Sequence, residues 1–322
     1  MTSNNAAIDV KSYKQTARLK GVPVTVDTVR VDGQIFIIQG KWLRTAELKY
    51  FWQEDVRDPE AVIGALKSSH AKADILKFWQ RIPDTEPKYP YYRETQHVAA
   101  IPITTHKYWF EKQISQKARN KIRKAAKLGV EIREEELNDA LIRGIMGIYN
   151  DSPLRRGKPF WHYGKDFETV KGELSEDLDI CRFVTAYSDG ELIGFIKFFI
   201  LDRYARTTLI LDKQSRREKS PMNSLVSKVV EICAEKGIPY FVYSIWRKGD
   251  HGHFQKSNGF IRTPVPQYFV PLTTKGRLAL FLHLHRGIKG WIPEKMMIRL
   301  LELRAKWYAR RFRTKAFRIV HK

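Results

Sequence analysis

The stretch CRFVTAYSDGELIGFIKFFILDRYARTTLILD, residues 181–212, predicts three consecutive strands. Its apolar runs are rich in β-branched and aromatic residues, which favour extended structure. The pair Asp189-Gly190 separates the first two runs and is typical of a tight hairpin turn. The stretch therefore predicts a meander of strands over residues 181–187, 191–201 and 205–212.

Helices and strands surround this predicted meander in a definite order. Ser220 and Pro221 suit the N-cap and the first turn of a helix that ends at Gly237. The segment 138–149 carries apolar residues at helical spacing. The other predicted elements are a strand at 130–133, a helix at 166–174, a strand at 239–245, a short helix and turn at 253–260, and a strand near 267–272. The resulting order is β-α-α-β-β-β-α-β-α-β.

A separate domain is predicted upstream, over residues 21–129, after a loose lead-in at residues 1–20. An Asp32-Gly33 turn lies inside an alternating apolar pattern at residues 24–39, which predicts a hairpin. The remaining elements are a helix at 59–69, strands at 73–79 and 98–103, and a basic helix from about residue 108 to 128 that stops at Gly129. Residues 130–272 would then form the second domain.

Composition limits the partners of this chain of 322 residues. Its 58 Lys and Arg against 35 acids give a net charge of +23, which favours a polyanionic neighbour such as nucleic acid, anionic lipid or a phosphorylated ligand. The two cysteines and nine histidines show no metal-ligand spacing, so no metal is expected. Without a visible secretory segment, a cytoplasmic protein is expected, one that can also be peripheral on the inner face of the membrane.

The segment 273–322 is predicted to be a basic helical tail. From Gly276 onward it holds thirteen Lys and Arg against two acids. A helix opening at Pro293 places Met296, Leu300 and Leu303 on one stripe. Three interpretations are open: the tail lies on an anionic membrane surface, holds tRNA phosphates, or packs on the domain with some anion contact.

The order of the second domain resembles the GNAT acyltransferase fold. The turn FQKSNGF at residues 254–260 is similar to a Phe-Tyr-x-Lys-x-Gly-Phe turn of many GNAT enzymes, with its lysine one place earlier. The segment from Arg119 to Val130 resembles the Arg-x-x-Ile-Arg-Lys-Ala-x-x-x-Gly-Val segment of Fem-type peptidoglycan aminoacyltransferases. Those proteins then have an Arg-containing loop and an aromatic helix, matched here by residues 155–158 and 160–163. The resemblance covers about residues 20–272.

This resemblance implies an α+β fold with a GNAT-like mixed sheet flanked by helices, in two GNAT-like halves. It implies an N-acyltransferase that uses acyl-CoA (acetyl-CoA) or aminoacyl-tRNA and an amine acceptor, such as a small molecule, a cell-envelope glycan or a lipid-linked precursor. Two departures matter. The segment 214–220, where GNAT enzymes have a glycine-containing pyrophosphate loop, has no glycine. Gln255 stands where many of them keep a tyrosine as general acid.

Candidate site residues follow from these positions. The catalytic candidates are His162, Tyr163, Asp250 and His251, and the acceptor-binding candidates are Arg155, Arg156, Lys158, Trp161 and Tyr243. The donor-binding candidates are Gln214, Arg216, Arg217, Lys219, Ser220, Asn223, Phe254 and Lys256. Arg119, Arg123 and Lys127 form a row at i, i+4 and i+8 for anion contact.

Each group also has a plainer interpretation. The aromatic residues at 160–163 would simply cap the sheet, residues 248–253 would form a polar turn, and the basic residues at 216–219 would form a solvated connection. Two other classes of protein also remain open. One is a nucleic-acid-binding protein without catalysis, and the other is a peripheral membrane protein on a catalytically degenerate GNAT scaffold.

Overall fold

The computed structural model describes residues 10–19, 22–155, 157–246 and 250–286, and its described residues form two compact units. Unit 1 takes its residues from Met1–Gln96 and from Pro264 onward, and unit 2 is His97–Thr263. The chain therefore divides at residues 96/97 and 263/264, whereas the sequence suggested a division at 129/130. The tail helix predicted from Pro293 lies outside the described residues.

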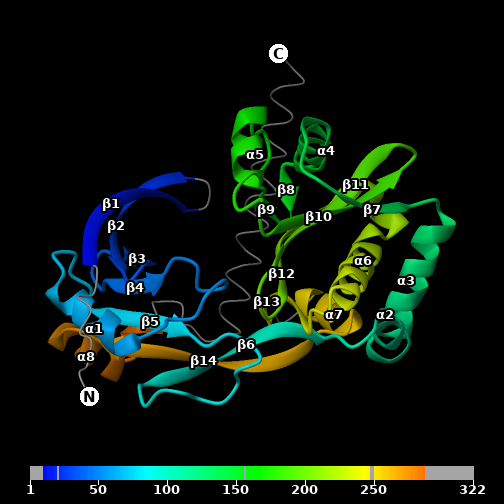
Figure 1. The fold of residues 1–322 in the computed structure, drawn as a ribbon. Helices are drawn as coiled ribbons and strands as arrows, with labels where there is room; N and C mark the ends of the chain where they lie inside the picture. Colours follow the sequence, from blue (N-terminus) through cyan, green and yellow to red (C-terminus); the bar gives the residue numbers. More distant parts are fainter. Residues whose placement is uncertain (1–9, 20–21, 156, 247–249, 287–322) are drawn as a thin grey trace. The chain divides into compact units, whose positions relative to one another are not determined.

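The predicted meander forms the middle of the sheet in unit 2 (Figure 1). Strands β10 (Cys181–Ser188), β11 (Glu191–Ile200) and β12 (Ala205–Asp212) are antiparallel neighbours. Asp189 and Gly190 both have positive φ, 53° and 75°, as the turn between two twisted strands requires. The sheet order is β6-β13-β12-β11-β10-β7, with β6 (Arg93–Pro102), β13 (Tyr240–Ile245) and β7 (Glu131–Glu135).

Helices cover both faces of this sheet, because successive side chains of a strand point to opposite sides. On β11, Phe195 and Phe199 pack in one core cluster with α4 (Asp139–Tyr149) and α5 (Phe167–Leu174). Ile196 and Phe198 pack in another with α3 (Gln116–Lys127) and α6 (Pro221–Glu235). This arrangement explains why β11 is apolar along nearly its whole length.

The sheet strands of unit 1 follow the order β1-β2-β3-β4-β5-β14 and include parallel and antiparallel pairs. The hairpin with the Asp32-Gly33 turn is confirmed as β2 (Val22–Val31) and β3 (Gln34–Gln39). Helix α1 (Pro59–Ser68), capped by Asp58, connects β4 (Thr45–Leu48) to the parallel strand β5 (Ile75–Trp79). Strand β14 (Ile261–Pro271) pairs antiparallel with β5, and α8 (Thr274–Phe281) follows it.

Two strands of unit 1 were not predicted. Residues Val10–Leu19 form β1, paired along their length with β2, so the expectation of a loose lead-in over residues 1–20 is wrong for this part. Strand β4 was also missed. Strand β1 lacks the alternating apolar pattern that marks β2 and β3, because most of its residues are polar. Strand β4 does alternate polar and apolar residues, but it is too short for this pattern to indicate a strand.

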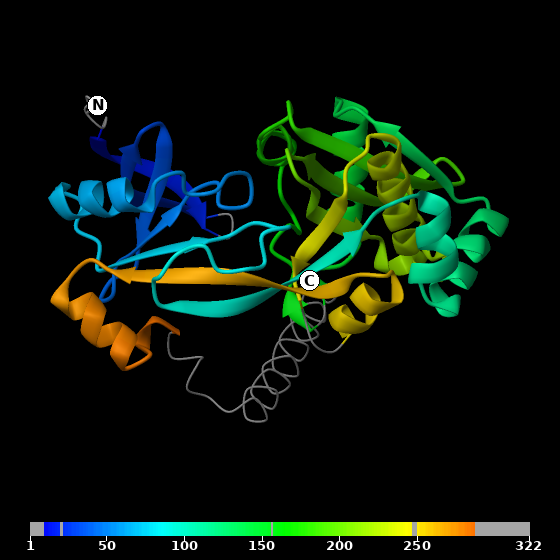
Figure 2. The same ribbon diagram turned by 60° about the horizontal axis from the view of Figure 1, so that its bottom comes forward.

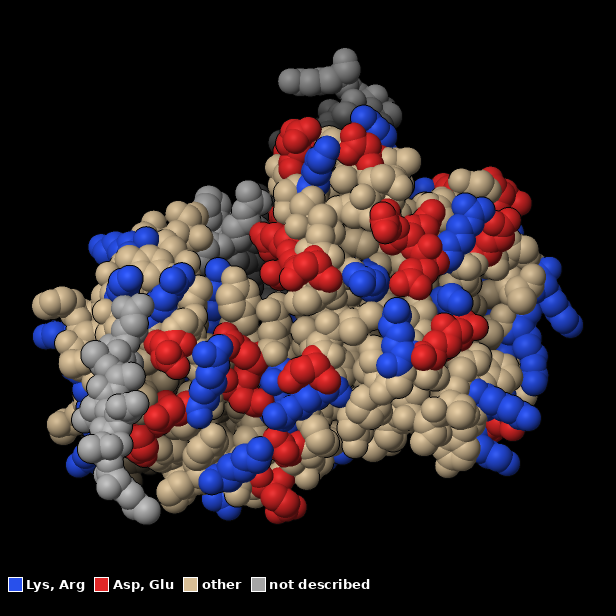
Figure 3. Space-filling model, in the orientation of Figure 1, with Lys and Arg blue, Asp and Glu red and all other residues tan. Residues whose placement is uncertain are grey.

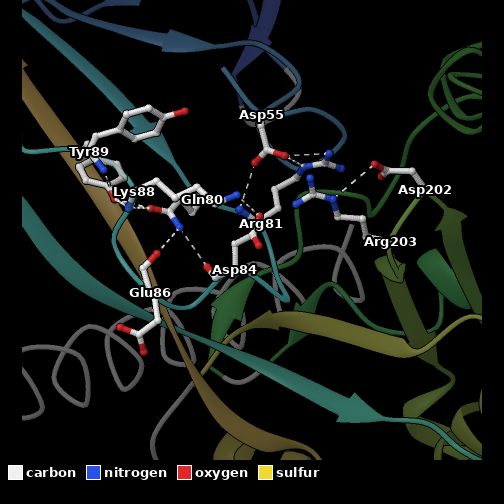
Figure 4. A network of polar contacts seen from close by, with 10 residues as sticks. Asp55, Gln80, Arg81, Asp84, Glu86, Lys88, Tyr89, Asp202 and Arg203 are labelled. Carbon is white, nitrogen blue, oxygen red and sulfur yellow. Dashed lines mark hydrogen bonds and ion pairs between the residues drawn. The ribbon is translucent and has the colours of Figure 1, made fainter. Parts of the chain in front are cut away.

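A polar network closes the loop that follows β5 in unit 1 (Figure 4). The Gln80 amide donates to the carbonyl oxygens of Asp84, at 3.3 Å, and Glu86, at 2.8 Å, and its oxygen accepts from Lys88 N at 2.9 Å. The buried Arg81 guanidinium pairs with the Asp55 carboxylate at 3.1 Å. A single buried glutamine thus pairs with backbone groups of three loop residues, and Lys88 N also donates to the Tyr268 hydroxyl at 2.8 Å.

The basic segment is not one helix, as the sequence suggested. It consists of α2 (His106–Tyr108), a π-helical turn η1 (Trp109–Gln113), an extended residue Ile114, and then α3. The Ser115 hydroxyl accepts from Ala118 N at 3.1 Å and so caps a new helix start. The break rotates α3 so that Ala118 and Ala125 face the core.

Ser220 also departs from its predicted role. Its backbone is left-handed, with φ 59° and ψ 41°, and its side chain makes no capping hydrogen bond to α6. Pro221 does occupy the first turn, as predicted. A 3₁₀ turn η2 (Gln214–Lys219) precedes it and sets the direction from which the chain enters the helix.

Among the residues that the structure describes, no helix has the length and apolar character to cross a bilayer.

Candidate active site

Strands β12 and β13 separate almost as soon as they meet. Their parallel pairing consists of Ala205 with Phe241 and Arg206 with Val242, and no further pair is formed between their described residues. Both strands carry a bulge just beyond, at Thr208 on β12 and at Tyr243 on β13. Bulges increase local twist and end pairing, so they explain the separation. We call this feature the β12/β13 opening.

Backbone and side-chain polar groups lie on the elements that border this opening. On β12, residues from Thr207 to Asp212 have no ladder partner among the described residues of β13. The Thr207 hydroxyl on β12 and the Ser224 hydroxyl on α6 are buried, and neither has a hydrogen-bond partner in the described part of the chain. These two hydroxyls thus add polar groups to the elements beside the opening.

The turn after β13 is held by two buried asparagines. Asn223 Nδ2, on α6, donates to Asn258 Oδ1 at 2.9 Å, and Asn258 Nδ2 donates to Phe254 O at 2.8 Å. Tyr243 packs its ring against Phe254 and Phe260, with centroids 5.9 and 5.5 Å apart. These contacts place the start of α6 and the turn after α7 (Asp250–Ser257) against each other. The predicted donor-binding residues Asn223 and Phe254 are therefore brought together, whereas Lys256 is exposed on α7.

The three basic residues predicted to hold a donor phosphate, of a diphosphate or of tRNA, are each paired with an acid. Arg216 Nε lies 3.0 Å from Glu191, Arg217 Nε lies 3.3 Å from Asp212, and Lys219 Nζ lies 3.7 Å from Asp189. A hydrogen bond from Lys213 and a second from Arg216 hold the pKa of Glu191 below its usual value, against the effect of burial. Each cation of the η2 turn thus has an acid beside it, but Glu191 is shared with Lys213 and Asp212 with Arg155.

The loop between α4 and α5 is tied to the same end of β12. Arg155, in the short strand β8 (Leu154–Arg155), donates to Asp212 O at 2.6 Å and lies 3.6 Å from the Asp212 carboxylate. Gln214 Nε2 donates to Leu154 O at 2.9 Å, and Gln214 N donates to Asp151 at 2.6 Å. The structure therefore joins the predicted acceptor loop to the predicted donor loop through Arg155 and Gln214.

His162 lies inside this loop, only 4% exposed. Its ring packs between Tyr149 and Trp161, at centroid distances of 4.2 and 3.6 Å, and neither ring nitrogen has a hydrogen-bond partner among the described residues. Burial lowers the pKa of His162 to about 3. Trp161 and Tyr163 are exposed on either side, and Lys165 Nζ lies 3.8 Å from the Trp161 ring centroid. A catalytic role for His162 or Tyr163 stays a prediction.

The residues of the row Arg119, Arg123 and Lys127 differ in their surroundings. The Arg119 guanidinium donates to the carbonyl oxygens of Phe110, Glu111 and Ile114, at 3.2, 3.0 and 2.8 Å. Arg119 thus caps the end of the π-helical turn. Arg123 and Lys127 are exposed. Lys117, Lys121 and Lys124 are also exposed and form a stripe at i, i+4 and i+7 along α3.

Positive charge therefore collects along α3. In Figure 3, blue side chains gather along the edge of unit 2 where Figure 1 shows α3. None of the α3 lysines forms an ion pair within the part of the chain that the structure describes. We call this surface the α3 basic face, formed by Lys117, Lys121, Arg123, Lys124 and Lys127.

Replacing Arg119 with methionine is expected to lower the free energy of unfolding of unit 2 by roughly 1–3 kcal/mol, because three carbonyl groups lose a charged donor. Replacing Arg123 with methionine, its matched control on the same helix, is expected to cost roughly 0.5 kcal/mol or less. Urea unfolding followed by circular dichroism would measure both. Equal losses for the two variants would contradict the capping role of Arg119.

Several predicted positions cannot be placed in this geometry. Arg156 and the side chains of Asp250 and His251 lie outside the described residues. Lys158 is exposed in β9 (Lys158–Pro159). Thr207, Thr208 and Ser224 were missed, because their surroundings in the sequence are those of ordinary strand and helix residues. Within the described ranges, no three His, Cys, Asp or Glu side chains are grouped so as to hold a metal ion.

Several solved structures have a fold similar to that of this chain. No protein-family model matches the chain, and no curated protein does. The structure of FemX matches over 84% of this chain and 90% of its own, with a TM-score of 0.52 and 10% identity. The C-terminal DUF2156 domain of a protein described as a lysylphosphatidylglycerol synthetase, from Agrobacterium fabrum, matches over 77% and 84%, with a TM-score of 0.52 and 13% identity. L-PGS from Bacillus licheniformis matches over 73% and 80%, with a TM-score of 0.50 and 13% identity.

These similarities confirm the predicted fold. The chain has an α+β, GNAT-like acyltransferase fold related to that of Fem-type proteins, with a large mixed sheet flanked by helices. Because the sequence identities are only 10–13%, these similarities support the fold and not a particular activity.

Proposed function

We propose that the chain is an N-acyltransferase that holds the reacting acyl group in the β12/β13 opening. The observation that carries this proposal is the early separation of the two parallel strands, with a bulge on each. An opening of this kind leaves backbone N–H groups of β12 free of ladder partners. Such groups are suited to stabilise the oxyanion that forms when an amine attacks a carbonyl carbon.

The reaction forms one C–N bond and breaks one bond from the acyl carbon to its carrier. The neutral amine attacks the carbonyl carbon, the tetrahedral oxyanion accepts hydrogen bonds from the edge of β12, and the carrier leaves as a thiol or a ribose hydroxyl. The proton lost by the amine ends on the leaving group. Of the two proton-transfer residues predicted on the acceptor loop, we propose the exposed Tyr163, because the buried His162 ring stays neutral down to about pH 3. Gln255, fully buried with its amide 3.4 Å from Ile245 O, has no acidic proton to supply.

We infer that the carrier is a tRNA in preference to coenzyme A. The cations of the η2 turn, Arg216, Arg217 and Lys219, each lie beside an acid, so a diphosphate would compete with these carboxylates for them. The α3 basic face instead offers five exposed cations over about three helical turns, a spacing that suits successive backbone phosphates. The name of one compared protein, a lysylphosphatidylglycerol synthetase, contains a lipid, and the resemblance to Fem-type proteins implies a cell-envelope acceptor. We therefore propose a lipid-linked or glycan precursor as the acceptor.

A binding and turnover experiment tests this proposal. The purified protein is expected to bind bulk aminoacyl-tRNA and to release its amino acid faster when an amine acceptor is present. Calorimetry with acetyl-CoA is expected to show no heat of binding. Binding and transfer with acetyl-CoA instead would overturn the choice of donor but keep the transferase. Binding of tRNA without any acceptor-dependent transfer would favour a nucleic-acid-binding protein on a degenerate scaffold.

The contribution of the α3 basic face has a matched control. The double variant Lys121→Glu and Lys124→Glu is expected to weaken tRNA binding at least tenfold. The slope of log K against log salt concentration should become shallower by about one for each phosphate that the variant no longer neutralises. The pair Lys67→Glu and Lys72→Glu changes the net charge equally on exposed residues of unit 1. Equal effects of both pairs would show that net charge, and not this face, governs binding.

A further inference from the structure

Helix α8 lies on the face of the unit 1 sheet opposite to α1 (Figure 2, α8 in orange). Ala279 and Leu280 pack on Ile75 and Phe269 in one small core cluster. Gly276 lies so close to β5 that an added Cβ would be 1.9 Å from Asp74 O. These three residues fix which side of the helix faces the sheet.

The opposite side of α8 is apolar and exposed. Leu278 is 56% exposed, Phe281 79% and Leu282 44%. Their spacing of three and four residues puts them on one stripe. Trp42, which is 61% exposed, adjoins α8 through Lys275, whose ammonium lies 5.2 Å from the Trp42 ring centroid and donates to the Trp42 carbonyl. We call these four side chains the α8 apolar surface.

Basic residues, and no acid of the same segment, surround this surface. Residues 273–286 contain Lys275, Arg277 and Arg286 but no Asp or Glu. Lys41, next to Trp42, is exposed as well. The two acids that contact this segment are already paired: Asp74 lies 3.3 Å from Lys275, and Glu94 lies 2.9 Å from Arg286. Arg277 and Lys41 thus leave a positive rim around an apolar centre.

We propose that the α8 apolar surface docks unit 1 on an anionic lipid bilayer. Leucine and phenylalanine side chains enter the boundary between headgroups and acyl chains, and the tryptophan lies at the headgroup level. Lysine and arginine extend their charged ends to lipid phosphates while their methylene stems stay beside the apolar centre. The positive rim selects an anionic bilayer in preference to a neutral one. This docking does not depend on the proposed transfer reaction.

Vesicle flotation tests the docking with the full chain. Wild-type protein is expected to float with vesicles of phosphatidylglycerol and phosphatidylcholine, and far less with phosphatidylcholine alone. The variant Leu278→Ser with Phe281→Ser is expected to partition at least tenfold more weakly, with an unchanged melting temperature, because both side chains are exposed. Arg277→Glu is expected to reduce binding to the anionic vesicles alone.

The control variant carries Tyr108→Ser and Leu128→Ser, two exposed apolar residues beside the α3 basic face of unit 2. It is expected to float like the wild type. Loss of flotation in this variant, with normal flotation of the α8 variant, would overturn the proposal in favour of α3.

Two further outcomes would also overturn it. If α8 instead contacts a second copy, light scattering without vesicles would show a dimer that the α8 variant lacks. If residues 287–322 cover α8, hydroxyl-radical footprinting of Phe281 would show protection in solution before any vesicle is added.

Discussion

Replacing Asn258 with leucine is expected to lower the free energy of unfolding of unit 2 by about 3 kcal/mol. Leucine has the same branched shape as asparagine, but its methyl groups are larger than the amide oxygen and nitrogen, so tighter packing adds to the loss at this fully buried site. It also removes two hydrogen bonds. The Asn223 amide loses its buried partner, and the Phe254 carbonyl keeps only the backbone N–H of residue 258. Each such group costs about 1–3 kcal/mol, and the melting temperature should fall by roughly 6–12 °C.

A double-mutant cycle identifies the source of this loss. Asn223→Leu and Asn258→Leu share one hydrogen bond, so the double variant should lose less than the two single variants added together. Asn120→Leu, on the exposed side of α3, serves as the control and should change stability by roughly 0.5 kcal/mol or less. Additive losses for Asn223 and Asn258 would show that the two amides do not depend on each other.

The centre of the fold was predictable because its signals are local. The Asp189-Gly190 turn and the apolar runs on either side specify β10 and β11 without reference to distant residues. Pro221 likewise marks the first turn of α6. Strand β1, by contrast, is rich in polar residues and forms because β2 lies beside it, so its pairing depends on a neighbour and not on its own pattern. The break at Ile114 depends in the same way on the Ser115 cap and on Arg119.

The candidate site was predictable only in part, for a similar reason. Tyr243 and Asn223 were identified from their positions in the predicted order, and both lie on elements that border the β12/β13 opening. The bulges at Thr208 and Tyr243 arise from pairing between strands far apart in the chain, and no local pattern announces them. The pairing of Arg217 with Asp212 is likewise a product of the folded chain. A sequence shows how many charges it has, but the fold decides which of them stay free.

His162 should make unit 2 less stable in mild acid, and a phenylalanine in its place should remove this effect. Burial, together with the charges of Lys165 and Arg155, lowers the pKa of His162 to about 3. The Glu173 carboxylate lies 4.0 Å from Nδ1 but is already paired with Lys165 at 2.6 Å, so it offsets little of this shift. The folded protein therefore keeps the ring neutral.

The sign of the effect follows from proton binding. An unfolded chain protonates this ring near pH 6.5, whereas the folded chain resists protonation down to about pH 3. Between these values the unfolded state binds more protons, so the free energy of unfolding falls as pH falls, by about 2 kcal/mol between pH 7 and pH 5. His162→Phe should flatten the profile by this amount and cost little at pH 7, because neither ring nitrogen has a partner to lose among the described residues.

Urea unfolding at pH 7, 6 and 5 would measure this difference, and His253→Asn, a change to an exposed histidine of the same unit, is the control. The wild type and the His253 variant should lose stability in parallel, while the His162 variant should diverge upward below pH 6.5. Parallel profiles for all three proteins would mean that the ring takes up its proton in the folded state. That result would show that His162 contacts solvent or a proton donor in the folded protein. A residue that exchanges protons during the transfer reaction needs such a contact.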